Sequence, residues 1–136
     1  MIVDSSALIA ILEGEPESGV MLRTISQAKS RRLSAASFLE TSIVVHSPRN
    51  AVSSRRFDEM VQELGLTIEP VTEAQARIAR EAYRDFGKGS GHKARLNFGD
   101  CFSYALARSE SEPLLFKGND FIHTDIRPAV ILKTSY

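Results

Sequence analysis

The chain has 136 residues, the length of one ordinary domain, and we expect a single domain over residues 1–136. Its hydrophobic fraction of 43% and charged fraction of 25% exclude an intrinsically disordered chain, which would be poorer in apolar residues. Lys plus Arg and Asp plus Glu both number 17, so the formal net charge is zero. This balance excludes nucleic-acid binding through bulk positive charge but leaves local contacts open.

Neither the cysteine content nor the hydropathy indicates an exported or membrane protein. Cys101 is the only cysteine, so no internal disulfide can form, and we expect a small buried side chain rather than a thiolate zinc ligand. The chain begins Met1-Ile2-Val3-Asp4, without the regions of a signal peptide, and no segment approaches the roughly 20 apolar residues of a membrane span. We therefore expect a cytoplasmic protein with no membrane partner.

The first half of the chain is expected to alternate strands and helices. A short apolar run opens the chain, as in a buried strand, and later runs have apolar residues at helical spacing. Ser5 and Ser6 are candidates to cap the first helix, and Ser37 pairs with Glu40 in a capping-box pattern. The expected elements are strands over Met1–Val3 and Arg32–Ala36, and helices over Ala7–Leu12, Pro16–Lys29, Phe38 to the Ser47-Pro48 stop, and Ala51–Leu64.

The second half continues this alternation. Thr72 and Gln75 form a capping box, Asn97 can cap a mostly apolar helix, and Gly87–Gly91 is typical of a flexible loop. Strands alternating with helices predict an α/β fold in which a mainly parallel sheet is covered on both faces. The expected elements are strands over Leu66–Val71, Pro113–Phe116 and Ala129–Leu132, and helices over Thr72–Phe86 and Phe98–Ser109.

Five acidic side chains fall where strands end or helices begin. Asp4 follows the first strand, Glu40 and Asp100 lie in early turns of helices, and Asp120 and Asp125 follow the strand before them. Each has an alternative role at a helix N-terminus, where acids cap the helix and complement its dipole. Because ligands bind outside the carboxyl ends of parallel strands, we nevertheless expect several of these acids to meet at one sheet edge.

A cluster of carboxylates indicates metal chemistry. Like charges a few Å apart raise one another's pKa values, and a divalent cation removes that conflict. Carboxylate oxygens and water suit Mg²⁺ or Mn²⁺, whereas zinc prefers His or Cys ligands. Such an ion lowers the pKa of a bound water and stabilises charge on a phosphate under attack. The pattern therefore favours hydrolysis of a phosphodiester bond.

Five segments in chain order resemble the VapC-type toxins of the PIN-domain family. They are Met1–Leu8, Leu33–Glu40, Asn97–Ala107, Leu114–Phe121 and Thr124–Ile126, which together extend over nearly the whole chain. The resemblance implies a three-layer α/β/α fold with a central parallel sheet and a Mg²⁺- or Mn²⁺-dependent endoribonuclease. It also implies a homodimer and neutralisation by a cognate VapB-type antitoxin.

The resemblance also assigns roles to the acids. Asp4 and Asp100 match direct metal ligands, and Glu40 and Asp120 match residues that act through water or as second ligands. These four form the expected catalytic site, with Asp125 as a candidate fifth member. Whether one or two ions bind stays open.

Substrate contacts are expected beside the acids. Ser5 or Ser6 is a candidate to hold a metal-bound water. The basic segment with Lys88, Lys93 and Arg95 either holds RNA phosphates or simply connects two elements.

Other conspicuous side chains are expected to be structural. The histidines show no metal-ligand spacing, so they are expected to be solvated or structural. Three aromatic residues stand at helical spacing in an apolar run and are expected to be core rather than base-stacking residues. These residues are His46, His92 and His123, and Phe98, Phe102 and Tyr104.

Two other functions stay open at this point. A receiver-like regulatory domain also binds Mg²⁺ in an acidic pocket, although the first strand here ends in a single acid and Asp100 falls on a helix. An inactive module would keep the fold for binding alone. For the toxin, we expect an antitoxin that inserts Arg or Lys among the acids, with the helices over Pro16–Lys29 and Ser37–Leu64 as apolar surfaces for it and for self-association.

Overall fold

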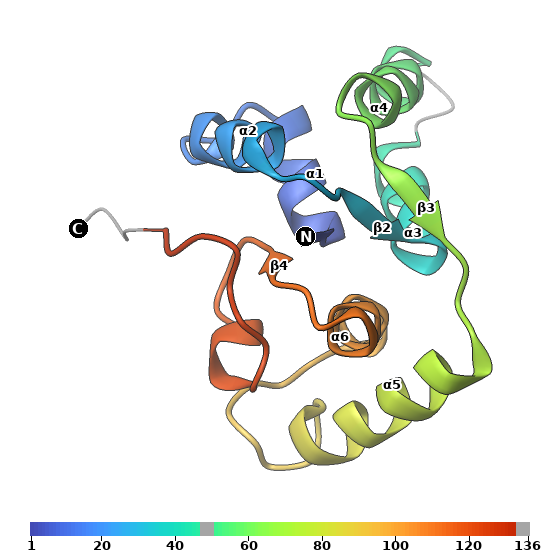
Figure 1. Ribbon diagram of the computed structural model, residues 1–136, viewed down its shortest axis with the longest axis vertical. Helices are drawn as coiled ribbons and strands as arrows, with labels where there is room; N and C mark the ends of the chain where they lie inside the picture. The colour runs from blue at the N-terminus through green and yellow to red at the C-terminus, as the bar shows by residue number, and fades with distance from the viewer. Residues whose placement is uncertain (47–50, 133–136) are drawn as a thin grey trace.

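A computed structural model describes residues 1–46 and 51–132 of the chain. Four parallel strands form a sheet in the order β3-β2-β1-β4 (Figure 1). The strands are β1 (Ile2–Val3), β2 (Arg32–Ser34), β3 (Thr67–Glu69) and β4 (Leu114–Leu115). The helices are α1 (Ser5–Leu12), α2 (Ser18–Gln27), α3 (Ala35–Val45), α4 (Val52–Glu63), α5 (Glu73–Phe86), α6 (Phe98–Glu110) and the short 3-10 helix η1 (Phe121–His123).

The sheet separates two apolar layers. Successive strand residues point to opposite faces, so Ile2 packs with α5 and α6 whereas Val3 packs with α1, α2 and α4. On β4, Leu114 packs in the same layer as Ile2 and Leu115 packs in the same layer as Val3. In Figure 1, α1, α2 and α4 lie on one side of the strands and α5 and α6 on the other. The expected three-layer fold with a parallel sheet is confirmed.

The strand expected over Ala129–Leu132 is wrong. The segment makes only an isolated parallel bridge between Pro128 and Leu114, formed by the Leu114 N–H donating to the Arg127 carbonyl (2.9 Å) and the Ala129 N–H donating to the Leu114 carbonyl (2.8 Å). β4 is two residues long and pairs with this segment at one bridge only, so no ladder forms along this edge.

Two helix caps differ from the expected ones. The Asp4 carboxylate, rather than Ser5 or Ser6, accepts the Ser6 N–H (3.0 Å) and caps α1, which confirms the alternative capping role of this acid. Ser34 caps α3, so β2 ends two residues before the expected Ala36. The capping box expected for Ser37 and Glu40 is therefore wrong, because both lie inside α3.

Two further helices begin at the caps that the sequence predicts, whereas α2 begins later than predicted. Thr72 caps α5 by accepting the Gln75 N–H (3.1 Å), and Asn97 caps α6. α2 begins at Ser18, so Pro16 precedes the helix instead of opening it. The Ser47-Pro48 stop lies outside the described residues.

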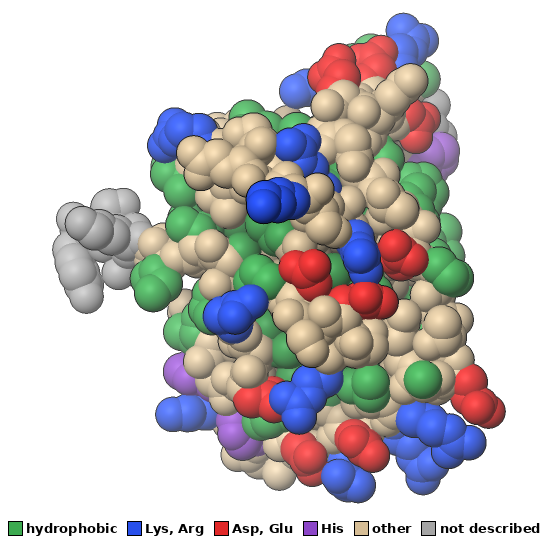
Figure 2. Space-filling model, in the orientation of Figure 1, with side chains coloured by type: hydrophobic (Ala, Val, Ile, Leu, Met, Phe, Trp, Pro, Cys, Tyr) green, Lys and Arg blue, Asp and Glu red, His purple; other side chains and the backbone are tan. Residues whose placement is uncertain are grey.

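The surface is electrostatically mixed. Figure 2 shows one face, on which acidic and basic side chains stand among each other without a large patch of one sign. Several are paired, as with Arg32 and Glu110 (2.7 Å) and with Arg108 and Asp125 (2.8 Å). Within residues 1–46 and 51–132, no helix is long and apolar enough to cross a membrane.

Candidate active site

Asp4 stands at the carboxyl end of β1 and is almost completely buried, with 2% exposure. Its Oδ2 accepts the Ser6 N–H at 3.0 Å, and its Oδ1 accepts the hydroxyl of Ser103 on α6 at 2.5 Å. A buried carboxylate needs such donors, because burial without partners strongly disfavours the charge. Asp4 is thus held in one orientation from two elements.

Glu40 reaches from α3 to the start of α6. Its Oε1 accepts the Ser5 hydroxyl at 2.6 Å. The carboxylate also lies directly against the backbone of Gly99, where an added Cβ would overlap it. A glycine is therefore required at position 99 because the Glu40 carboxylate approaches its backbone closely, and not because of the backbone conformation. Gly99 directly precedes Asp100, so this contact brings Glu40 beside a second acid.

Asp100 belongs to a complete capping box at the start of α6. Its backbone N–H donates to the Asn97 side chain (2.8 Å), and its Oδ2 accepts the Asn97 N–H (3.0 Å). Burial raises the pKa of Asp100 to about 7; the Asn97 N–H lowers it, and the charges of Asp4, Asp120 and Glu40 raise it further. The capping alternative is thus confirmed, yet Asp100 also shares its surroundings with three other acids.

The four carboxylates supply oxygen donors of the kind that Mg²⁺ accepts, but they do not form a closed cage. Among residues 1–46 and 51–132, no three Asp, Glu, His or Cys side chains converge closely enough to form a ready metal site. Asp100 and Glu40 are turned to their hydrogen-bond partners, and Asp120 is exposed. The donors are nevertheless carboxylates, and Mg²⁺ usually keeps several waters in its coordination shell, so that one or two carboxylates can bind it directly.

Asp125 is engaged away from these four acids. It accepts the Tyr104 hydroxyl (2.6 Å) and an Arg108 N–H (2.8 Å) on α6. Both partners lie further along α6 than Asp100, and Asp125 is not among the charges that raise the Asp100 pKa.

Backbone hydrogen bonds fix both ends of the basic loop that precedes α6. The Lys88 N–H donates to the Leu96 carbonyl (2.7 Å) and the Leu96 N–H to the Phe86 carbonyl (2.9 Å). Lys88, Lys93 and Arg95 are exposed, and none has an ion-pair partner within the part of the chain that the structure describes. The loop thus offers three free cations just before the capping box.

Cys101, His92 and Tyr104 are placed as expected, whereas Phe102 is only half-buried and Phe98 is exposed. Cys101 is buried, and burial followed by the Asp100 charge raises its pKa to about 11, so the thiol stays neutral. His92 is structural, since its Nδ1 accepts the Ala94 N–H (3.0 Å). The core assignment holds for Tyr104 but is wrong for Phe98, which is 78% exposed because it occupies the first, outward-facing position of α6.

Three residues at the site carry no sequence signal that would have found them. Lys117, at the carboxyl edge beyond β4, pairs with Glu15 and Glu17, and its N–H donates to the Ser6 hydroxyl (3.0 Å). Ser37 and Ser103 are buried serines within helices, and only the packing of α3 on α6 brings them together.

Comparison with known proteins decides the family. A family model of the PIN domain matches residues 1–127. The chain belongs to the PIN-domain family. Ribonuclease VapC28 of Mycobacterium tuberculosis is 57% identical over 130 residues, which cover 96% of this chain and 98% of that protein. The resemblance to VapC-type PIN domains is thereby confirmed, and the receiver-like alternative is set aside.

Two solved structures share the PIN fold. VapC20 of Mycobacterium tuberculosis, described as a sarcin-ricin loop cleaving toxin, has a TM-score of 0.70 at 17% identity over 92% of this chain and 95% of that one. A toxin–antitoxin complex from Klebsiella pneumoniae contains a chain with a TM-score of 0.66 at 16% identity over 88% of each chain. At these identities the likeness concerns the fold alone.

Proposed function

We propose that this PIN domain is a Mg²⁺- or Mn²⁺-dependent endoribonuclease and the toxin of a toxin–antitoxin pair. The observation that carries the proposal is the grouping of acids around the start of α6: Glu40 lies against Gly99, and the pKa of Asp100, raised mainly by burial, is raised further by the charges of Asp4, Asp120 and Glu40. The 57% identity to a protein named as a ribonuclease supports the same reaction.

In the proposed site, Asp4 and Asp100 would be direct metal ligands, with Glu40 and Asp120 acting through water. The ion would stabilise negative charge on the scissile phosphate and lower the pKa of water. The chain's own residues orient the groups: Ser103 and the Ser6 N–H fix Asp4, and Ser5 fixes Glu40.

The basic loop would hold the RNA. Lys88, Lys93 and Arg95 offer charge to backbone phosphates, which position a nucleic acid without reading its sequence. The Ser6 hydroxyl accepts the Lys117 N–H, so its own O–H would be available to donate to a metal-bound water.

The test is cleavage of RNA by the purified chain with Mg²⁺ or Mn²⁺ and with EDTA. Asp4→Asn and Asp100→Asn should each lower the rate by about a hundredfold or more, because each removes a ligand charge while nearly keeping shape. The control is Glu59→Gln, an exposed acid on α4, which should cleave like the wild type. Full cleavage by Asp100→Asn in EDTA would overturn the mechanism, and a wild type inert with both metals would favour an inactive binding module.

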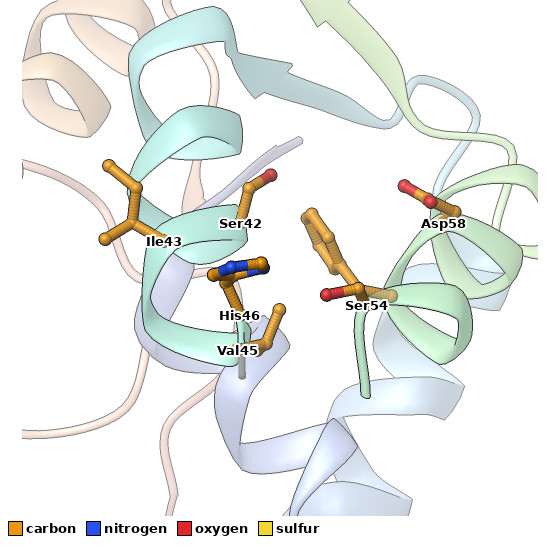
Figure 3. Close-up of a pocket in the computed structure, with 7 residues that line it drawn as sticks. Ser42, Ile43, Val45, His46, Ser54 and Asp58 are labelled. Carbon is orange, nitrogen blue, oxygen red and sulfur yellow. The ribbon is translucent and has the colours of Figure 1, made fainter. Parts of the chain in front are cut away.

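The proposed antitoxin would bind along α3 and α4. A hollow of about 380 Å³ lies between them, with Ser42, Val45 and His46 on one side and Ser54 and Asp58 on the other (Figure 3). A tail seated there would have to extend a long Arg or Lys side chain around α3 to reach Glu40, which faces Ser5 and Gly99. Co-expression with the open reading frame upstream of the gene should relieve growth arrest and yield a co-purifying complex. Harmless expression of the chain alone, with no such complex, would overturn the toxin assignment but not the nuclease.

We also propose a homodimer through the exposed apolar residues beside the acids. Leu39 and Ile43 on α3 are 59% and 65% exposed, and Phe98 on α6 is 78% exposed. Leu39 and Phe98 each adjoin a residue of the Glu40–Gly99 contact, so a partner copy would cover the rim of the site. Light scattering should give twice the chain mass for the wild type and the monomer mass for Phe98→Ser.

A further inference from the structure

Two buried serine hydroxyls connect the helices that carry the acids. Ser37 on α3 is 1% exposed and Ser103 on α6 is fully buried. Their Oγ atoms lie 3.1 Å apart, and the Ser103 hydroxyl donates to Asp4 Oδ1 at 2.5 Å. A hydroxyl has one proton, and an ionised carboxylate can only accept. The Ser103 proton therefore goes to Asp4, and Ser37 must donate to Ser103.

This chain of bonds has a defined place in the fold. Ser37 lies three residues before Glu40 on α3, and Ser103 lies three residues after Asp100 on α6. Residues at this spacing are neighbours on one helix face. The two hydroxyls thus join α3, α6 and the end of β1, the three elements that supply Glu40, Asp100 and Asp4.

We propose that Ser103, supported by Ser37, is a positioning residue that sets the Asp4 carboxylate for a divalent ion. The inference rests on the metal site of the proposed function. With Oδ1 held by Ser103 and Oδ2 by the Ser6 N–H, the carboxylate plane is fixed from two sides, and each oxygen keeps a lone pair for an ion. Hydrogen-bond partners behind metal ligands commonly contribute to affinity in this way.

A purely structural role would have a different signature. If the two serines only satisfied buried polar atoms, their removal would lower stability and leave metal affinity alone. Thr41 provides the matched case on α3: its buried hydroxyl donates to the Ser37 backbone carbonyl (2.8 Å) and reaches no acid.

The experiment titrates the full-length protein, free of RNA, with Mn²⁺ and measures free Mn²⁺ by electron paramagnetic resonance. Ser103→Ala should raise the Kd for Mn²⁺ about tenfold, and Ser37→Ala should raise it by a smaller factor. Ser103→Thr, which keeps the hydroxyl, should restore the wild-type Kd. Thr41→Val should keep the wild-type Kd even where its metal-free melting temperature falls.

The outcomes separate this inference from the proposed function. A wild-type Kd in folded Ser103→Ala would overturn the positioning role and leave the nuclease proposal standing. A wild type that binds no Mn²⁺ would overturn both. If Ser103→Ala does not fold, Ser37→Ala decides, because it leaves the donor to Asp4 in place: a raised Kd supports the inference and an unchanged Kd overturns it.

Discussion

Asp100 combines two roles that place opposite demands on its charge. As the partner of Asn97 in the capping box, Asp100 accepts the Asn97 N–H, which favours the carboxylate, whereas its burial among other acids favours the neutral acid. Burial prevails, and the pKa rises from 3.8 to about 7. A metal-free site is therefore under electrostatic strain at neutral pH, which bound cations would relieve.

This strain gives a pH-dependent prediction. Between pH 3.8 and about 7 the folded protein holds a proton on Asp100 that the unfolded chain has lost, so metal-free stability should fall as pH rises through this window. Asp100→Asn, whose amide oxygen can still accept the Asn97 N–H, should flatten this dependence. In EDTA at pH 8 it should melt about 3 °C or more above the wild type, with the difference closing near pH 4. Lower melting at both pH values would show that the cap outweighs the charge.

Gly99 allows a second prediction at the same scale. Gly99→Ala places a Cβ where the Glu40 carboxylate lies, so Glu40 must move away from Ser5, and RNA cleavage should fall at least about tenfold. The matched control is Gly19→Ala, also at the second position of a helix, where the new Cβ would meet only the Arg23 side chain at 3.6 Å. Gly19→Ala should keep full activity. Equal activity in both variants would contradict the assigned place of Glu40.

At the scale of elements, Asp125 joins the segment after β4 to α6. Its bonds to Tyr104 and Arg108 secure the stretch that also carries Asp120 and η1. The Asp125 bond and burial together raise the pKa of Tyr104, burial being the larger cause, so the hydroxyl remains a donor throughout the physiological range.

The prediction for Asp125 distinguishes a structural role, in which Asp125 holds the segment after β4 against α6, from a role as a fifth metal ligand. Tyr104→Phe and Asp125→Asn should each lower the free energy of unfolding by about 1 kcal/mol, the usual effect of losing one such bond. Neither should change the Kd for Mn²⁺, measured by the same free-Mn²⁺ signal. A Kd raised tenfold in Asp125→Asn but not in Tyr104→Phe would instead make Asp125 a ligand.

The sequence predicted the elements well where local signals act alone. Thr72 and Asn97 mark their helices because capping is a contact within four residues. The prediction of a strand over Ala129–Leu132 was wrong because pairing depends on the neighbouring strand, and the two-residue β4 pairs with this segment at one bridge only. Acid positions at strand ends could be inferred from topology, but Ser37, Ser103 and Lys117 could not, since only helix packing and strand register bring them to the site.

At the scale of the whole molecule, RNA affinity has to come from a few local charges. The formal net charge is zero, so the chain has no net positive charge to attract a polyanion, and the face in Figure 2 mixes both signs. The acidic site itself repels phosphates. Unpaired cations near α6 are therefore the best candidates to hold the substrate, and Lys93 and Arg95 are exposed there.

Salt dependence can test this directly. In an Asp4→Asn background, which prevents cleavage, Lys93→Ala and Arg95→Ala should each weaken binding of a fluorescent RNA and reduce the slope of log affinity against log salt by about one, because one fewer phosphate contact releases one fewer counterion. Arg77→Ala is the control, since Arg77 on α5 is paired with Glu73 (3.6 Å), and its slope should match the Asp4→Asn parent. Fluorescence anisotropy from low to physiological salt measures all three. If the slopes of Lys93→Ala and Arg95→Ala equal that of Arg77→Ala, the loop is a connector and contributes no phosphate contact to RNA binding.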